Sequence, residues 1–200
     1  RDEAPRREGL PHVLVGAHLA FALLPGRDHD HRDAFGPRVQ AQGAGRGLVG
    51  ELEVRETGDR YPALTFSGNG FSEGAATIVT YGGMVPIVLD SVTELVLEHE
   101  IFCEVVALSQ LLPMELEPVL ESVARTGALV TAEEGTLTGG FGAEIAARVQ
   151  EAAWSDLRGP VQRVAARDGI IPSARPLEDA MLPSAADVVE AVLVLEGVRQ

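Results

Sequence analysis

The chain has 200 residues, 46% of them hydrophobic and 4% aromatic, which is enough for one good-sized domain with an aliphatic core. All 16 basic residues are arginines, and the lack of lysine excludes a pyridoxal Schiff base, a Walker-type phosphate lysine and a lysine nucleophile within this chain. The single cysteine, Cys103, excludes an intrachain disulfide and a cysteine-based zinc site.

The negative charge is concentrated in the second part of the chain. The net charge is −14. Residues 1–66 hold 10 acidic residues against 9 arginines, whereas residues 67–200 hold 20 against 7. Such a surface repels nucleic acid and anionic membranes, so neither is expected as a partner, whereas a basic protein partner or simple solubility fits. No run of 18 apolar residues occurs and Leu10–Leu24 lacks a signal-peptide pattern, so a cytoplasmic location is expected.

The first 74 residues carry little regular patterning. Val13–Val15 is typical of a short buried strand. Residues 25–60 have no clean period and contain the run Gly43–Gly47, which predicts a linker or long surface loop. Short strands are expected near Leu48–Val54 and Ala63–Phe66.

From residue 75 onward, strand-like and helix-like patterns alternate. β-branched and apolar runs predict four strands, at residues 77–81, 101–108, 128–132 and 160–165. Helical spacing predicts helices over 85–96 and 116–123, and Gly127 supplies the C-terminal glycine of the second.

Two further helices follow. One opens at Gly139–Gly142, and the residues expected on its buried face are Phe141, Ile145, Val149 and Ala152. The other begins at Ser184 as N-cap, with Val188, Val192 and Leu195 on its buried face. The alternating order predicts an α/β fold, a three-layer sandwich with a mostly parallel sheet and right-handed crossovers.

In such sheets the functional crevice lies at the carboxyl ends of the strands. Three turns fall there: Tyr81–Met84, Ser109–Gln110, and the segment from Glu133 to Gly142. The glycines of the last could cradle a phosphate at a helix N-terminus. They lack the third glycine of the dinucleotide fingerprint, and the two upstream carboxylates would repel a phosphate, so a turn or helix-entry role is favoured.

Other candidate groups have unremarkable interpretations. Adjacent strand residues point to opposite faces, so Glu133 and Glu134 need not form an acid/base dyad, and a solvated or interface role is expected for both. The run Asp28–His31 could ligate a metal, but a solvated loop is favoured. His12 and His18 are expected to be core or interface histidines, and Cys103 to fill the core. With no serine in a nucleophile elbow, the residues indicate an acidic α/β domain without a self-contained active site.

Six motifs follow one another along the second part of the chain: Thr77–Gly82, Glu104–Glu115, Ser122–Val130, Glu133–Glu134 with Gly139–Ala146, Pro160–Val164 with Ile171–Pro172, and Leu177–Glu178 with Leu182–Ser184. In this order they resemble the C-terminal domain of the transketolase family, and most closely that of the β subunit of the E1 component of 2-oxo acid dehydrogenases. A further stretch, Pro11–Ala20, is similar to the last strand of that family's pyrimidine-binding domain.

The resemblance implies three parts: residues 1–24 as the end of a pyrimidine-binding domain, residues 25–74 as a linker or long loop, and residues 75–200 as the transketolase C-terminal-like domain. In this family thiamine diphosphate and magnesium lie between the pyrimidine domain and a diphosphate domain. The resemblance therefore assigns no catalytic, cofactor-binding or metal-binding residue to this chain, and no cofactor is expected to bind it alone. The enzyme activity of the chain itself stays open.

The resemblance also implies a role in assembly, as a homodimer or an α/β-type hetero-oligomer, with a lipoyl acyltransferase core component as a further partner. The residues expected at a subunit interface are Gly139, Gly140, Phe141, Gly142, Glu133 and Glu134. The residues expected to dock a basic partner are Glu178, Asp179, Asp187, Glu190 and Glu196.

The parent reaction implied is oxidative decarboxylation of a 2-oxo acid. A transketolase-like or acyloin-forming carboligase shares this domain and is the alternative enzyme. A non-catalytic interaction module in a biosynthetic pathway is the alternative of a different class.

Overall fold

A computed structural model of the chain describes residues 52–57, 61–68 and 74–199. Several expectations fall outside these residues. They concern the segment 1–24 with its strand at Val13–Val15, the histidines at positions 12 and 18, and the run Asp28–His31. Over the described residues, no helix has both the length and the apolar character needed to cross a bilayer.

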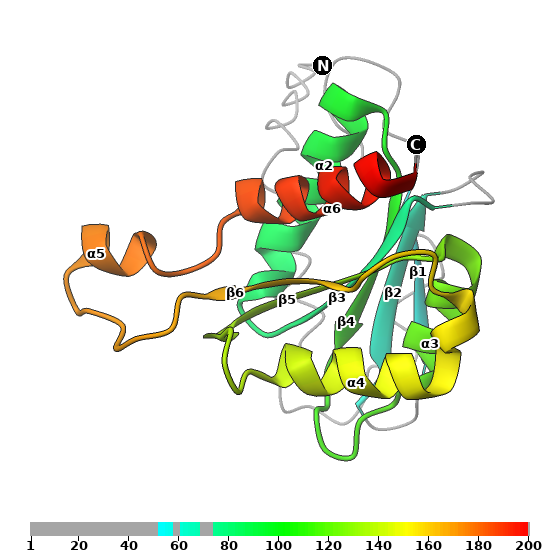
Figure 1. The fold of residues 1–200 in the computed structure, drawn as a ribbon, viewed down its shortest axis with the longest axis horizontal. Coiled ribbons are helices and arrows are strands. Elements are labelled where there is room, and N and C mark those ends of the chain that lie inside the picture. Colours follow the sequence, from blue (N-terminus) through cyan, green and yellow to red (C-terminus); the bar gives the residue numbers. More distant parts are fainter. Residues whose placement is uncertain (1–51, 58–60, 69–73, 200) are drawn as a thin grey trace, which may run out of the picture.

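Six strands and five α-helices follow one another in the described part of the chain (Figure 1). A single 3₁₀ turn, Trp154–Asp156, follows α4. The elements in chain order are β1 (Leu52–Thr57), β2 (Ala63–Gly68), β3 (Ala76–Tyr81), α2 (Met84–His99), β4 (Cys103–Leu108), α3 (Glu117–Thr126), β5 (Leu129–Thr136), α4 (Phe141–Ala153), β6 (Gln162–Ala166), α5 (Arg175–Asp179) and α6 (Ala185–Arg199).

The strands form one sheet in the order β1-β2-β4-β3-β5-β6. The four strands β4, β3, β5 and β6 are parallel, whereas β1 and β2 are antiparallel additions at one edge. The chain moves from β3 to β4 in one direction and then returns past β3 to β5. Because right-handed crossovers fix the face on which each helix lies, this reversal puts α2 on one face and α3 and α4 on the other.

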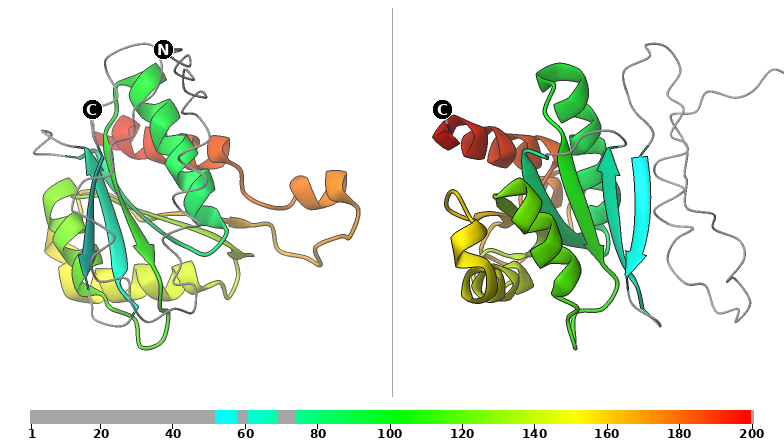
Figure 2. Two further views of the ribbon diagram at one scale, coloured as in Figure 1. Left: turned by 180° about the vertical axis from the view of Figure 1, so that it is seen from behind. Right: turned by 90° about the vertical axis from the view of Figure 1, so that its right-hand side faces the viewer.

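The helices make this a three-layer sandwich, as the sequence predicted. Helices α2 and α6 cover one face and α3 and α4 the opposite face (Figures 1 and 2). Neighbouring residues of each central strand enter different cores: Ile78 and Val105 pack under α2 and α6, whereas Val79 and Val106 pack under α3 and α4. Burial on both faces explains why these strands are continuously apolar.

Two strands come from the segment expected to be a linker or long loop, residues 25–74. β2 pairs with β4, with Leu64 opposite Ala107 and Phe66 opposite Val105, and β1 pairs with β2. The expectation of a strand at 63–66 is confirmed, and β1 overlaps the other expected strand. The sheet therefore extends across residue 75, which was the expected domain boundary.

The expected helix faces are largely confirmed, with one error. In α4 the buried residues are Gly142, Ile145, Val149 and Ala153, while Ala152 is exposed. The steps from Ile145 to Val149 and from Val149 to Ala153 are four residues each, which keeps the three side chains on one stripe. Helix α6 begins after Ser184, whose hydroxyl and amide both donate to the Asp187 carboxylate at 2.6 and 2.7 Å. The Asp187 N–H donates back to the Ser184 hydroxyl at 3.4 Å, which completes a reciprocal cap of the capping-box type.

A buried polar network joins α3 to the amino ends of β3 and β4. The Glu104 carboxylate accepts hydrogen bonds from the Ser122 hydroxyl at 2.7 Å and from two nitrogens of Arg125 at 2.6 and 2.9 Å. The Thr77 hydroxyl lies 2.7 Å from that of Ser122 and 2.8 Å from that of Thr126. Each side chain of this network has a partner, as burial requires.

Gly127 ends α3 in the left-handed conformation, with φ of 70° and its N–H bonded to the Val123 carbonyl. An added Cβ would also lie 2.5 Å from Nε of Arg158. We expect Gly127→Ala to lower the free energy of unfolding by about 1–2 kcal/mol, the cost of a left-handed non-glycine residue. Urea denaturation measures the change.

Gly197→Ala is the matched control, because this helical glycine has open space around it and no positive φ. Alanine there should raise stability by about 0.4–1 kcal/mol. Equal effects of the two substitutions would contradict a special role for Gly127.

Candidate functional site

The topology predicts a crevice at the carboxyl ends of β3 and β5. The connections that follow these two neighbouring strands run to opposite faces of the sheet. The place where they diverge is the topological switch point, and ligands bind there in open α/β folds. The last residue of β3 is Tyr81, and Glu133 lies in the neighbouring strand β5. The two side chains meet at this point.

Glu133 is 1% exposed, and its carboxylate is held from two sides. One oxygen, Oε2, accepts the Tyr81 hydroxyl at 2.6 Å. The other, Oε1, accepts the backbone N–H of Gly142 at 2.8 Å. Gly142 is in the first turn of α4, where free backbone N–H groups and the helix dipole favour a negative charge. The carboxylate therefore serves as an internal cap of α4.

Three glycines make room for this carboxylate. A Cβ at Gly135, Gly140 or Gly142 would lie 2.8, 2.5 or 2.6 Å from a Glu133 oxygen. Contacts that short are not tolerated between a Cβ and a fixed carboxylate. Glycine is therefore required at these three positions because a carboxylate of the protein itself occupies the space. This supports the helix-entry role expected from the sequence for the Gly139–Gly142 turn.

The same carboxylate influences the ionisation of Tyr81. Its ring packs edge-on against Phe141, with ring centroids 6.1 Å apart and planes at 90°, a favourable arrangement for two aromatic quadrupoles. Burial, followed by the hydrogen bond to Glu133 and the negative charges of Glu133 and Glu134, raises the pKa of Tyr81 well above its ordinary value of 10.0. The phenol is thus held protonated, as a donor.

Glu133 and Glu134 separate as adjacent strand residues must. Glu134 is exposed and its carboxylate lies over Gly83, where a Cβ would be 2.8 Å from Oε1. The two side chains point apart, as the geometry of a strand predicted. The expectation of a solvated or interface Glu133 needs correction, because its partners lie within the chain. Phe141 is half-buried beside Tyr81.

Sequence reasoning singled out the turn at Tyr81 but missed the Tyr81–Glu133 pair. A second missed group is Thr131, whose buried hydroxyl has no hydrogen-bond partner in the part of the chain that the structure describes. It lies 2.8 Å from where a Cβ of Gly142 would be. Neither the Tyr81–Glu133 hydrogen bond nor the position of Thr131 beside Gly142 could be predicted from one sequence. Both depend on which strands are neighbours in the sheet, and the sequence does not state that order.

The residues at this crevice do not fit thiamine diphosphate with magnesium. The Gly142 N–H that could meet a phosphate is occupied by Glu133, and a carboxylate there opposes an anion. Among the described residues, no three acidic, histidine or cysteine side chains are grouped to hold a metal ion. No catalytic step through that cofactor can be derived from this chain.

Most of the expected docking acids surround a second feature, a groove of about 500 Å³ between β6, α6 and the segment before α6. Asp179, Asp187 and Glu190 line it, but Glu178 does not. Asp187 is engaged as the cap of α6, and the hydrogen bonds from the Ser184 hydroxyl and amide hold the pKa of its carboxyl below the ordinary value. It is therefore a structural residue as well as a surface charge.

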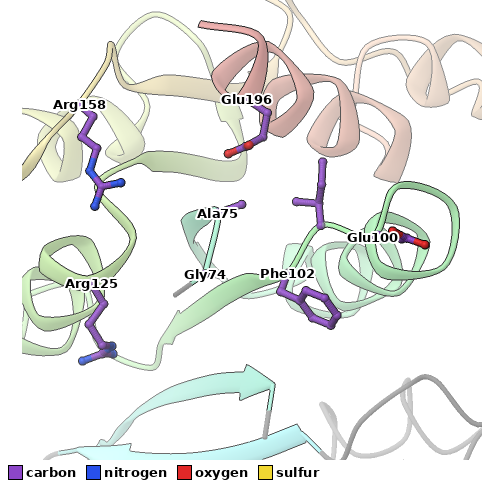
Figure 3. Close-up of a pocket in the computed structure, with 8 residues that line it drawn as sticks. Gly74, Ala75, Glu100, Phe102, Arg125, Arg158 and Glu196 are labelled. Atoms are coloured by element: carbon purple, nitrogen blue, oxygen red, sulfur yellow. The ribbon is translucent and has the colours of Figure 1, made fainter. Parts of the chain in front are cut away.

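Glu196 lies elsewhere, in a cavity of about 280 Å³ at the amino ends of the strands. Figure 3 shows Glu196 and Arg158 projecting toward this space from opposite sides. Arg125 also lines it, but its guanidinium is engaged by Glu104. The structure thus separates Glu196 from the other docking candidates.

We expect Glu133→Ala to lower the free energy of unfolding by about 3 kcal/mol, because two buried donors lose their acceptor at about 1–3 kcal/mol each. Glu133→Gln should cost less, since the amide can accept from Gly142 and donate to the Tyr81 oxygen. The neighbouring Glu134→Gln is the control and should change stability by less than about 0.5 kcal/mol. A control as damaging as Glu133→Ala would refute the capping role.

The same variants change the titration of Tyr81. In a Tyr61→Phe background, Glu133→Gln should bring the pKa of Tyr81 down toward 10.0, as followed by ultraviolet absorbance of the phenolate. A raised pKa in the folded state contributes stability that is present below the unfolded pKa and is lost as pH rises through the folded one. The parent chain should therefore lose more stability above pH 10 than Glu133→Gln does.

The comparisons with known proteins agree with this fold. The family described as "Transketolase, C-terminal domain" matches residues 72–188. The pyruvate dehydrogenase E1 component subunit beta of Rickettsia bellii is 41% identical over 118 residues, covering 59% of this chain and 36% of that protein. The corresponding subunit of Leifsonia xyli is 44% identical over 117 residues, covering 58% and 34%.

Two further matches have different names. The 3-methyl-2-oxobutanoate dehydrogenase subunit beta of Mycobacterium tuberculosis is 38% identical over 120 residues, covering 58% of this chain and 34% of that protein. A solved structure titled "Split gene transketolase, inactive beta4 tetramer" is 33% identical with a TM-score of 0.56, covering 64% of this chain and 42% of that one. The chain spans about a third of the length of these curated relatives. It belongs to the transketolase C-terminal-domain family.

Proposed function

We propose that this chain is the assembly domain of a β-type E1 subunit of a thiamine-diphosphate-dependent 2-oxo acid dehydrogenase. The observation that carries the proposal is the internal occupation of its crevice: Glu133 fills the switch point where a ligand would bind. A domain with a filled crevice contributes through its surfaces. Relatives named as E1 beta subunits, at about 40% identity, support this parent enzyme.

In this proposal thiamine diphosphate and magnesium are held by other domains of the assembled enzyme, and the chain alone binds neither. The surface next to the crevice, formed by the Gly139–Gly142 turn with Phe141 and Glu134, makes contact with another subunit. The lipoyl acyltransferase core is a further partner, and the location is cytoplasmic.

A transketolase-like or carboligase parent is the second candidate. It is favoured by the solved relative titled as a split-gene transketolase, which is 33% identical to this chain. Because the two candidate parent enzymes share this domain, only an assay of the assembled enzyme distinguishes them. One would decarboxylate a 2-oxo acid, and the other would transfer a group between sugars.

A domain replacement tests the assembly role. Residues 52–200 of this chain, which carry all six described strands, would replace the C-terminal domain of the Rickettsia bellii β subunit, expressed together with its α subunit. We expect assembly by light scattering, and pyruvate decarboxylation once thiamine diphosphate and magnesium are added. The same β subunit without a C-terminal domain is the control and should fail to assemble. A replaced subunit that melts cooperatively yet stays unassembled would contradict the proposal.

Docking of a basic partner is tested separately through the groove acids. Asp179→Asn together with Glu190→Gln should slow association with an acyltransferase-core binding domain, because exposed carboxylates steer a cation. The association rate of the parent chain should fall as salt rises and shortens the Debye length to about 8 Å at physiological ionic strength. Glu98→Gln, an exposed acid on α2, is the control. A rate indifferent to salt would rule out electrostatic steering.

A further inference from the structure

Hydrogen-bond donors from three elements surround the space that the Glu133 carboxylate fills. Two of them, the Tyr81 hydroxyl of β3 and the Gly142 N–H of α4, bind its oxygens at 2.6 and 2.8 Å. The third is the hydroxyl of Thr131 in β5, which is 1% exposed and has no hydrogen-bond partner in the part of the chain that the structure describes. Converging donors of this kind are what an anion-binding site is made of.

The Thr131 hydroxyl is aimed at the first turn of α4. The point where a Cβ of Gly142 would stand lies 2.8 Å from this hydroxyl and 2.6 Å from Oε1 of Glu133, so the two oxygens flank the same backbone atom. Helix α4 has 13 residues and no side-chain cap at its N-cap, Gly140, so its N-terminal end carries a partial positive charge. A buried hydroxyl without a partner is costly, and this one is therefore an unused donor beside that helix end.

The three donors are held in place by contacts other than those with Glu133. Thr131 belongs to β5, which is paired on one side with β3 and on the other with β6. The ring of Tyr81 packs edge-on against Phe141. The first turn of α4 is anchored by the burial of Ile145 and Val149 in the same helix. The donors should therefore keep their positions when the Glu133 side chain is shortened.

The shape of the space matches a planar carboxylate. Tyr81 addresses Oε2 and Gly142 addresses Oε1, so each donor meets a different oxygen of one flat group. The backbone closes around those oxygens, since a Cβ at Gly135 or Gly140 would stand 2.8 or 2.5 Å from one of them. Such a close fit favours a carboxylate over the tetrahedral oxygens of a phosphate.

We propose that the crevice is a preformed carboxylate-binding site whose ligand is the protein's own Glu133, and that a small free carboxylate takes its place when this side chain is shortened. The ligand class is an aliphatic monocarboxylate no larger than the part of the side chain that is removed. The inference goes beyond the proposed function, because it concerns ligand binding by the chain alone and not its assembly.

The size of the ligand follows from the substitution. Glu133→Ala removes Cγ and the carboxylate, which are the heavy atoms of acetate. Glu133→Gly removes Cβ as well, and the missing heavy atoms are then those of propionate. Each variant therefore has its own matched ligand, and the pair tests whether the free anion occupies the place of the side chain.

Urea denaturation of the full chain at about pH 7, where acetate is ionised, gives the first measurement. A ligand that binds only the native state raises the midpoint with the logarithm of its concentration. We expect this rise for Glu133→Ala in acetate, with ionic strength held constant by chloride, and no rise for the parent chain. Glu98→Ala, which shortens an exposed acid on α2, is the control. If Glu133→Ala is unfolded without acetate, recovery of a cooperative transition in acetate is the expected result.

Two outcomes of this measurement would overturn the proposal. One is a midpoint of Glu133→Ala that acetate leaves unchanged or raises no more than that of the parent chain and Glu98→Ala. The other is a larger rise in phosphate than in acetate, which would mean that the site is not built for a carboxylate. Neither outcome affects the domain replacement that tests the proposed function, because that experiment uses the unsubstituted domain.

The second measurement locates the ligand. Isothermal titration should show acetate binding more tightly than propionate to Glu133→Ala, and the reverse order for Glu133→Gly. Adding Tyr81→Phe to Glu133→Ala should raise the acetate dissociation constant about tenfold, since a hydrogen bond to a charged group is lost. Adding Thr131→Val should also weaken binding, although the Thr131 hydroxyl makes no hydrogen bond in the parent chain. An acetate affinity indifferent to both additions would place the ligand elsewhere and refute the proposal.

Discussion

The buried carboxylate of Glu133 is the constraint on which the carboxyl-end architecture depends. Removing a carboxylate from water costs several kcal/mol unless it is hydrogen-bonded, and here the donors come from two other elements. Tyr81 of β3 and the N–H of Gly142 in α4 both bind it. One side chain of β5 thus sets the positions of β3 and α4, and it requires glycine at three surrounding positions.

This arrangement has a functional consequence. In an open parallel sheet the switch point is the natural place for a ligand, because loops diverge there and helix N-termini face it. In this chain the same helix N-terminus is satisfied from within. The backbone N–H that could meet a phosphate is instead bonded to a protein carboxylate, and this occupation is what supports the proposed role in assembly.

A second buried carboxylate, that of Glu104, accepts hydrogen bonds from a neighbouring helix at the opposite end of the sheet. Glu104 near the start of β4 gathers Ser122 and Arg125 of α3, while Glu133 gathers donors near the end of β5. Each lies on the side of the sheet covered by α3 and α4, because Ser122 and Gly142 belong to these helices. The chain has 30 acidic residues, and within its described part Glu104 and Glu133 are the acidic side chains that are buried and paired with local donors.

Much of this fold could be predicted from the sequence because its signals are local. The alternation of apolar runs and helical spacing indicated strands and helices from residue 75 onward, and Gly127 and Ser184 marked a helix end and a helix start through backbone requirements that any chain obeys. Strand order is not a local property. The rule that neighbours on a strand point apart separated Glu133 from Glu134, but it could not say which one faces the core.

Residues 167–184, an arm that projects from the domain between β6 and α6 (Figures 1 and 2), show the other limit of local reasoning. Ile171 and Pro172 were noticed as part of a family motif, yet nothing in their immediate sequence distinguishes an apolar pair in a core from one held in solvent. Only the fold reveals that the chain leaves the domain at Arg167 and returns at Met181. An apolar segment fixed at its base and uncovered at its tip is costly for a monomer to display. The exposure of Ile170 and Leu177 therefore has no signal in the sequence, because the burial of a side chain depends on where the fold brings the chain and not on the residues beside it.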